Sequence, residues 1–433
     1  MTRRETLLRL KLEPSPPVAT MEIPGARSRP LSIEFEDLDG IEEAWGRAGR
    51  ALRSLVEKAP SRSAHATDIA QVMFTLHKAG HELGQRLTDG DNYAWNKLQQ
   101  ELTLHRATRW PSFAKDDLPI VEVVAHGHGF PVELIPLGPA GGEEPKHIDN
   151  DLQLLAFAER FLGFSALVSR FPPDREPSPA ELDNDPTLPI QLFRYRSPPP
   201  VSTASPTPPP DGFRREETFL KGLAQLSVDG PYPSDADIEG EVADRVTAAL
   251  FDAGTPLRAG VEATAVVAHF ACHCTAGKHI EDFKLLLSTE SGAGRPVTLG
   301  AIMGGYGTLG EGRPAADGLP PRAVVVLNAC DSSAVDPLSS LGFQRWFLKN
   351  SHPAFLGTLA AIPDAMAADF AELLYRFLLG GCTLGASVVL ARRELLLTAK
   401  SPLGMLYSLH GNEQLTVHTP HPDVLPTSAA RGN

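Results

Sequence analysis

The spacing of apolar residues indicates a helix-rich N-terminal region with a few strands. Apolar and polar residues alternate after Leu8, which is typical of a strand. Between about residues 38 and 104 the apolar residues instead recur three or four positions apart, which predicts helices. The helical positions are Ile41, Ala44, Trp45, Ala48, Leu52, Leu55, Ile69, Val72, Leu76 and Leu83. We therefore predict an N-terminal α/β region over residues 1–115, for which the sequence indicates no role.

The next two segments differ from each other in composition. Residues 116–170 contain an apolar run at 117–125, which predicts a buried strand, and a helical pattern at 151–168. Residues 171–214 are rich in Pro, Ser and Thr, which predicts a solvated linker interrupted by one strand-like run at 189–195. The plain interpretation of this segment is a connector and nothing more.

From residue 215 to 425, strand-like and helical segments alternate. This order is typical of an α/β fold with a mostly parallel sheet and helices on both faces. Two of the strand-like runs, residues 264–273 and 324–330, each end on a reactive side chain, His273 and Cys330. Because open α/β sheets build their sites at the carboxyl edge of the strands, we expect the thiol and the imidazole to meet there.

A thiol beside an imidazole predicts a cysteine nucleophile with its general base. The imidazole lowers the pKa of the thiol and carries the proton to the leaving group. Cys330 also has a structural interpretation, because a small buried cysteine is common at a strand end. His269 is the competing base, but its place inside an apolar run is more typical of a core histidine.

Charged residues near these strand ends suggest how a substrate and an activator are recognised. Asp331 and Asp282 are candidate substrate-binding acids, since a carboxylate can pair with a basic side chain of a peptide. Arginines in or beside the Pro-rich segment mark a candidate activation-cleavage region, because that segment is expected to be exposed. These arginines are Arg194, Arg196, Arg214 and Arg215.

Composition excludes several other classes of protein. The formal charge of −13, with 40 basic against 53 acidic residues, argues against a nucleic-acid surface. No apolar run approaches the roughly 20 residues of a membrane span, and the N-terminus is too charged for a signal peptide, so we expect a soluble cytoplasmic protein without membrane contact. The four cysteines suit neither a disulfide framework nor a zinc site.

We also expect no cofactor. Residues 305–310 match a dinucleotide-binding fingerprint by letter, but the Gly- and Pro-rich residues that follow do not suit the helix that binds a pyrophosphate. We therefore predict a loop there, and a nucleotide-dependent enzyme is the least favoured reading.

Several short motifs, in order, resemble the CHAT family of caspase-like cysteine proteases. His269-Phe-Ala-Cys-His273 resembles the family's histidine motif, and Leu327-Asn-Ala-Cys330-Asp331 resembles its nucleophile motif. Further similar segments follow up to His410, and one earlier segment at 130–134 extends the resemblance to roughly residues 117–420. By this resemblance, residues 116–170 are the first, non-catalytic part of a CHAT domain and residues 215–425 its catalytic part.

The resemblance implies a caspase-type sheet with His273 as base and Cys330 as nucleophile. It also implies cleavage of a protein substrate in bacterial (antiviral) defence, switched on by an activating protein or an upstream protease. The chain departs from the family where Cys274 replaces a glycine and Asp331 replaces the commoner glutamate. The oxyanion would then be held by the backbone N–H groups of Cys274 and Cys330.

The leading hypothesis is accordingly a cysteine endopeptidase with a Cys330–His273 dyad and a preference for a basic residue before the scissile bond. The alternative is a catalytically degenerate caspase-fold module that binds a partner without cutting it.

Overall fold

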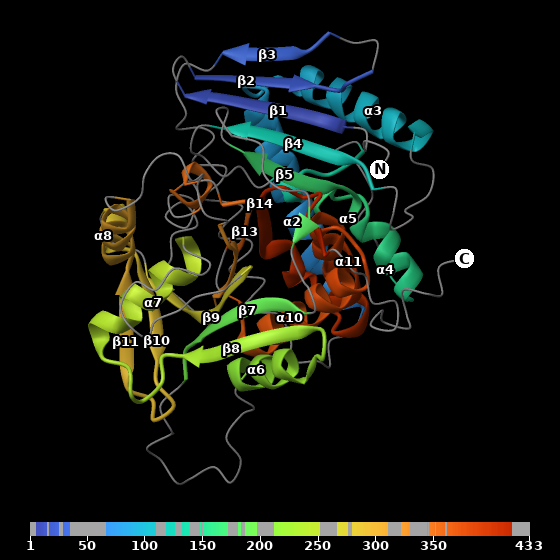
Figure 1. Ribbon diagram of the computed structural model, residues 1–433. Coiled ribbons are helices and arrows are strands. Elements are labelled where there is room, and N and C mark those ends of the chain that lie inside the picture. The colour runs from blue at the N-terminus through green and yellow to red at the C-terminus, as the bar shows by residue number, and fades with distance from the viewer. Residues whose placement is uncertain are drawn as a thin grey trace.

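A computed structural model gives the arrangement of most of the chain. The residues that it describes are 6–14, 17–25, 29–34, 66–109, 118–125, 132–138, 148, 150–171, 181–182, 187–196, 212–251, 266–275, 279–310, 322–329, 344, 346–350, 352–359 and 362–417. They form two main sheets with helices packed against them (Figure 1). The predicted α/β class is confirmed.

The first sheet combines strands from the two ends of the N-terminal half. Its order is β3-β2-β1-β4-β5, with β1 parallel to β4 and β4 parallel to β5. The strands are β1 (Thr6–Pro14), β2 (Pro17–Glu22), β3 (Leu31–Glu34), β4 (Ile120–Ala125) and β5 (Leu167–Phe171). The predicted boundary at 115/116 therefore falls inside one sheet and does not separate two folding units.

Two long helices cover this sheet, as the apolar periodicity predicts. They are α2 (Ala66–Leu87) and α3 (Asn92–Arg109), and residues 38–65 lie outside the described part of the chain. Leu83 of α2 and Trp95 of α3 share a buried core with Leu8 and Val121 of the strands. Three shorter segments complete this half: η1 (Val132–Leu134), α4 (Asp151–Ala158) and α5 (Leu162–Ser165).

The second sheet carries the strands expected to hold the reactive residues. The central strands β7, β9, β12 and β13 are parallel, and β10, β11 and β14 pair in antiparallel fashion at the two sides. The strands are β7 (Leu188–Arg194), β8 (Leu226–Tyr232), β9 (Val267–Thr275), β10 (Lys284–Ser288), β11 (Gly294–Thr298), β12 (Val324–Ala329), β13 (Ala354–Thr358) and β14 (Tyr407–Gly411). A further short pair joins β6 (Glu181–Leu182) to β15 (Thr416–Val417).

Strand β7 confirms the strand predicted at 189–195 within the Pro-rich segment 171–214, and shows that this part is not a solvated connector. It lies between β8 and β9 in the second sheet, with nearly every side chain buried. The apolar run at 188–193 can satisfy its backbone groups and bury its side chains only by entering the sheet, so this part of the Pro-rich segment is core.

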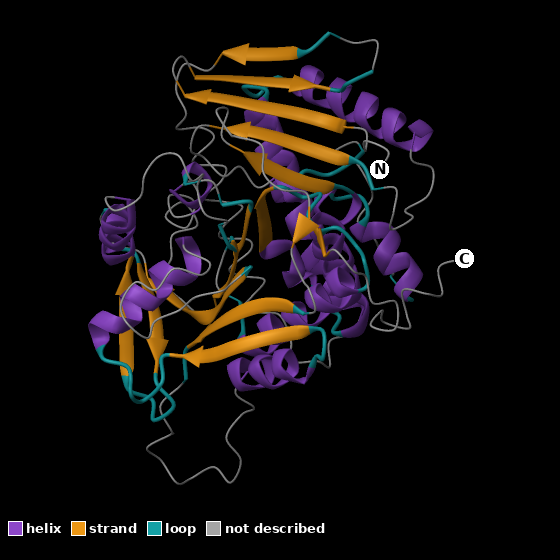
Figure 2. Cartoon of the chain, viewed as in Figure 1, coloured by secondary structure: helices purple, strands orange, loops and turns teal. Residues whose placement is uncertain are grey.

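Helices pack against both faces of the second sheet (Figure 2). On one face lie α6 (Gly212–Gly222), α10 (Asp364–Leu379) and α11 (Leu384–Thr398), and on the other lie α7 (Glu239–Phe251) and α8 (Leu299–Gly310). The short turns η2 (Ile280–Asp282) and η3 (Pro402–Leu406) complete the described elements.

Helix α8 shows that the prediction of a loop at 305–310 was wrong. A side-chain Cβ at Gly305 would come within 2.8 Å of Thr247 in α7, so the absence of a side chain lets the two helices approach closely. No helix in the described part of the chain is long and apolar enough to cross a membrane.

Two buried histidines make the stability of the N-terminal half sensitive to acid. His77 and His81 of α2 lie with their rings 4.6 Å apart. The pKa of each is lowered to about 4, for both mainly by burial, to which the charges of His81 and Arg160 add in the case of His77. The unfolded chain, with a histidine pKa near 6.5, therefore binds more protons than the folded chain between pH 6.5 and 4, so stability is full above this window and falls as the pH falls.

We expect the free energy of unfolding to decrease by about 1.5 kcal/mol per ring between pH 6.5 and pH 5. The double variant His77→Phe/His81→Gln is expected to lose most of this part of the pH dependence. Urea unfolding at several pH values between 5 and 7 measures both slopes. Equal slopes for the wild type and the variant would contradict the assignment.

Candidate active site

Strand β9 holds His273 near its carboxyl end. Side chains alternate along a strand, so His269, Ala271 and His273 point to the face that packs against α6 and α10. The His273 ring, half-buried, lies 4.5 Å from the ring of Tyr195, which follows β7, and 5.3 Å from that of Phe213 in α6. These two aromatic rings fix where the imidazole lies.

Strand β12 runs parallel to β9 and leads to the predicted nucleophile. The register pairs Val324 with Val267 and continues residue by residue until Ala329 pairs with Cys272. Val324 and Val326 share the α6 and α10 face with Val267, and Asn328 hydrogen-bonds residues of both helices there. Cys330 and Asp331 themselves lie outside the described residues.

His269 occupies the core, as the apolar run around it predicts. Its side chain is fully buried, its Nδ1 lies 2.9 Å from the hydroxyl of Tyr375, and its Nε2 lies 2.6 Å from Oε1 of Glu216. Both ring nitrogens are thus engaged away from the strand end. This placement favours His273 over His269 as the base.

Cys274, the predicted oxyanion residue, is buried one residue beyond His273. The Ala271 carbonyl accepts a hydrogen bond from the Tyr195 N–H, so the backbone groups of Ala271 point toward β7. Backbone groups alternate in direction along a strand, so the N–H of Cys274 points to the opposite side, the side of β12. The described part of β12 ends opposite Cys272, so no described residue of β12 pairs with Cys274.

Asp282, the second predicted substrate-binding acid, lies in the turn η2 after the carboxyl end of β9. Its side chain is exposed, and its carboxylate accepts a weak hydrogen bond of 3.3 Å from the N–H of His279. The group is therefore at the correct edge of the sheet and open to a ligand. Among the described residues no group of three or more His, Cys, Asp and Glu could hold a metal ion.

The arginines proposed as cleavage sites are held in folded elements, and Arg194 is the clearest correction. It ends β7, is 4% exposed, and forms ion pairs with Glu217 and Glu290. Arg196 pairs with the same Glu290, and its backbone N–H and carbonyl both bind the hydroxyl of Ser288. A protease needs an extended, accessible chain, so cleavage at Arg194 is incompatible with this fold.

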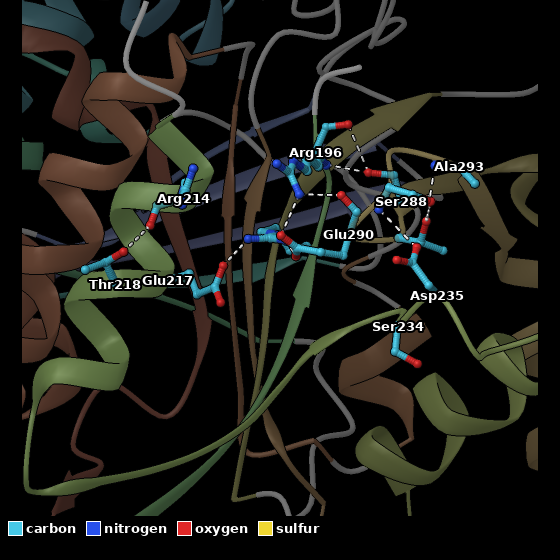
Figure 3. Close-up of polar contacts among 12 residues, drawn as sticks. Arg196, Arg214, Glu217, Thr218, Ser234, Asp235, Ser288, Glu290 and Ala293 are labelled. Atoms are coloured by element: carbon cyan, nitrogen blue, oxygen red, sulfur yellow. Dashed lines mark hydrogen bonds and ion pairs between the residues drawn. The ribbon is translucent and has the colours of Figure 1, made fainter. Parts of the chain in front are cut away.

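Arg214 and Arg215 lie in the first turn of α6 and not in a linker, because the helix begins at Gly212. The Arg214 side chain is exposed, and its carbonyl accepts a hydrogen bond of 2.8 Å from Thr218 (Figure 3). Arg215 pairs with Asp369 of α10. Cleavage at either residue would require the start of α6 to unfold.

Sequence reasoning missed Glu216, which joins the two strands of the site. Its Oε1 accepts a hydrogen bond of 2.7 Å from Nδ2 of Asn328 and lies 2.6 Å from Nε2 of His269. A signal was present: an acid stands in the apolar stripe of α6 between Phe213 and Leu220, both buried. A charged residue in such a stripe indicates a specific buried partner.

Comparison with known proteins bears on the C-terminal half. A family model described as the CHAT domain matches residues 240–421, and no curated protein matches the chain. Two crystal structures of the Saccharomyces cerevisiae separase–securin complex align with 95% of this chain and 30% of theirs. Their sequence identities are 11% and 12% and their TM-scores 0.39 and 0.38.

The chain thus spans about a third of the length of those separase chains, and TM-scores this low carry no argument about function. The family match begins at α7, so residues 116–239 lie outside it and their assignment to the same domain stays a prediction. The match includes β9, β12 and the position of Cys330. The region that contains both predicted catalytic strands is therefore similar to the CHAT domain.

Proposed function

We propose that this protein is a cysteine endopeptidase in which Cys330 is the nucleophile and His273 the general base. The observation that carries the proposal is the register of β9 and β12, in which Ala329 and Cys272 are partners. Cys330 follows Ala329 by one peptide bond, about 3.8 Å between Cα atoms. Adjacent strands lie about 4.8 Å apart, so we expect position 330 at the edge of the sheet that carries His273.

The alternation of side chains supports a shared face as well as a shared edge. Position 330 follows Val324, Val326 and Asn328 at the same two-residue spacing, and we propose that it shares their α6 and α10 face. His273 points to that face, where its ring contacts Phe213. The thiol and the imidazole would then face each other, as a dyad requires.

In the proposed reaction, His273 takes the thiol proton and the thiolate attacks the scissile carbonyl carbon. The negative charge moves to the carbonyl oxygen, where the N–H groups of Cys274 and Cys330 stabilise it. The imidazolium gives its proton to the leaving amine as the C–N bond breaks. Water, deprotonated by the same imidazole, then hydrolyses the thioester and releases the acid and the free thiol.

The substrate and the setting follow from the same resemblance. We propose a basic residue before the scissile bond, paired with Asp331 or Asp282, because a carboxylate at this edge is suited to a cation. By the resemblance to the CHAT family, the role is a cytoplasmic bacterial defence protease that an activating protein or an upstream protease switches on.

New N-termini in a treated lysate test the proposal. Wild-type protein and Cys330→Ala are each incubated with lysate, and the N-termini formed are identified by mass spectrometry. We expect peptides that share a basic residue before the new N-terminus with wild type and none with the variant. Products that are the same with both proteins would remove Cys330 from the reaction.

The alternative, a caspase-fold module that binds without cutting, predicts a different result. Such a protein would give no new N-termini under any condition that activates its partner, and it would capture the same partner whether residue 330 is cysteine or serine.

A further inference from the structure

A buried hydrogen-bond network includes residues of β9 and β12 that shortly precede the proposed dyad in the sequence. Five side chains take part, each 1% exposed or less: Glu216, His269, Asn328, Tyr375 and Tyr407. Glu216 meets His269 and Asn328 through one oxygen, Tyr375 lies 2.9 Å from Nδ1 of His269, and Tyr407 donates to Oδ1 of Asn328 at 2.5 Å. The network therefore joins β9, β12 and β14 to α6 and α10.

The two strand residues in this network precede the proposed catalytic residues closely. His269 and His273 lie on the same face of β9, with only Ala271 between them on that face. Asn328 is two residues before Cys330 and is the partner of Ala271 in the ladder. Glu216 thus contacts β9 at His269 and β12 at Asn328, a few residues before the proposed catalytic position on each strand.

Helix α6 holds Glu216 firmly against the rest of the fold. Gly212 lies so close to α10 that an added Cβ would come within 2.4 Å of the backbone of Asp364. Phe213, three residues before Glu216, packs its ring against that of His273. The first turns of α6 therefore contact the ring of His273 through Phe213, and they contact β9 and β12 through Glu216.

The hydrogen-bond donors of the network are placed so that His269 and Asn328 can both donate to Glu216. Burial and the nearby charge of Glu216 raise the pKa of Tyr375 well above its usual value, so its hydroxyl remains a donor. A donor at Nδ1 of His269 leaves Nε2 to carry the ring proton toward Glu216. The amide of Asn328 supplies the second donor, and it also bonds the carbonyl of Ala367 at 3.0 Å.

Stability alone does not explain an acid at this position. A buried carboxyl group loses its hydration, and an apolar side chain of similar size is often at least as stabilising. In Glu216 this cost is not fully offset, because Oε2 has no hydrogen-bond partner among the described residues. The carboxyl group instead provides one oxygen, Oε1, that lies within hydrogen-bond distance of side chains from both β9 and β12.

We propose that Glu216 is a positioning residue that holds the carboxyl ends of β9 and β12 in register, so that the Cys330 thiol and the His273 imidazole meet. This inference rests on the proposed dyad, and it gives helix α6, through Glu216, the role of aligning Cys330 with His273. The described side chains that Glu216 meets at Oε1 are His269 and Asn328, so in this proposal it acts on the dyad through them.

Kinetics of two variants, on a peptide taken from a mapped cleavage site, test the inference. Glu216→Leu keeps the volume but removes both hydrogen bonds, and we expect kcat to fall about 100-fold with KM close to wild type. Glu216→Gln keeps an acceptor oxygen, and we expect a smaller fall of about tenfold, the effect of weakening one hydrogen bond. The rate of Cys330 alkylation by iodoacetamide at pH 6 is expected to fall in the same order, because a displaced imidazole no longer stabilises the thiolate.

Leu220→Ala is the matched control, because it truncates a buried side chain of the same helix. The leucine side chain has no polar atom, so it forms no hydrogen bond in the network. It is expected to lower the melting temperature but to retain kcat and the rapid alkylation at pH 6. If Glu216→Leu lowers kcat no more than Leu220→Ala does, Glu216 is structural only and the inference is wrong. If Glu216→Leu does not fold, Glu216→Gln decides, and a kcat equal to wild type overturns the inference.

Failure of the proposed function is a separate outcome. Activity that persists in Cys330→Ala would show that the dyad is wrong, and the positioning inference would then fall with it. An inactive Cys330→Ala together with a fully active Glu216→Gln would overturn the positioning role and leave the dyad in place.

Discussion

Replacing His273 by alanine is expected to lower kcat on a mapped peptide by about 10²–10⁴-fold, the usual contribution of a general acid–base group. The reason is that the thiol then loses the group that takes its proton and later protonates the leaving amine. Replacing Cys330 by alanine is expected to reduce activity to background. Because the two residues act as a unit, the double variant should be no less active than Cys330→Ala alone.

Alkylation of Cys330 gives a measure of the same pair that needs no substrate. A thiol beside an imidazolium has its pKa lowered from about 8.5 to 7.5 or below, so the wild type should react with iodoacetamide at pH 6 at least about tenfold faster than His273→Ala. The matched control is His279→Ala, which removes an exposed ring in the turn after the same strand and should leave the rate unchanged. Cys272 and Cys274 are buried and should react slowly in every variant.

Two outcomes would contradict the dyad. One is a His273→Ala protein that retains wild-type kcat, and the other is a double variant much less active than Cys330→Ala. Either result would mean that the two side chains act independently or do not meet. The pairing of β9 with β12 would then have a structural role only.

The strands of the site could be predicted from the sequence because their signals are local. Residues 267–275 and 324–329 are compact apolar runs bounded by polar or glycine-rich segments, so strand formation follows from the pattern itself. The predicted parallel pairing of the two strands is confirmed up to Ala329, and the meeting of His273 with Cys330 stays a prediction. The placement of His269 in the core followed for the same reason.

Errors arose where distant residues determine local structure. Arg194 follows an apolar run inside a Pro-rich segment, and composition averaged over that segment predicts exposure. Its burial depends on Glu217 in α6 and Glu290 after β10, 23 and 96 residues away in the chain. No local pattern reports such pairs.

The glycine-rich helix α8 illustrates a different limit. Glycine has the lowest helix propensity of the residues other than proline, so propensity predicts a loop at 305–310. Packing against Thr247 of α7 requires a residue without a side chain at Gly305, and the resulting close contact stabilises the helix. Tertiary contact outweighs propensity there, and only the fold reveals the contact.

Replacing Glu133 by alanine is expected to cause the largest loss of stability, about 3–5 kcal/mol, because it leaves two arginines buried without their anion. Glu133 of η1 is fully buried, and its carboxylate binds Arg170 of β5 at two points and Arg392 of α11 at 3.4 Å. Burial raises the pKa of Glu133, but the charges of Arg170 and Arg392 outweigh that effect and hold it below its usual value. Arg392 also donates to the carbonyls of Gly163 and Tyr407, so the cluster joins the N-terminal half to the second sheet.

Urea unfolding measures this effect against an ion pair that is only partly buried. Glu372→Ala removes the partner of Arg376 on the surface of α10 and should change the free energy of unfolding by no more than about 0.5 kcal/mol. Replacing the whole cluster by apolar residues, as Glu133→Leu/Arg170→Met/Arg392→Met, should recover much of the loss, since no buried charge then remains unpaired. A Glu133→Ala protein as stable as the wild type would mean that water or another anion reaches the two arginines. A triple variant less stable than Glu133→Ala would mean that the attraction within the cluster, and not the cost of unpaired charge, sets the stability of the junction between the two halves.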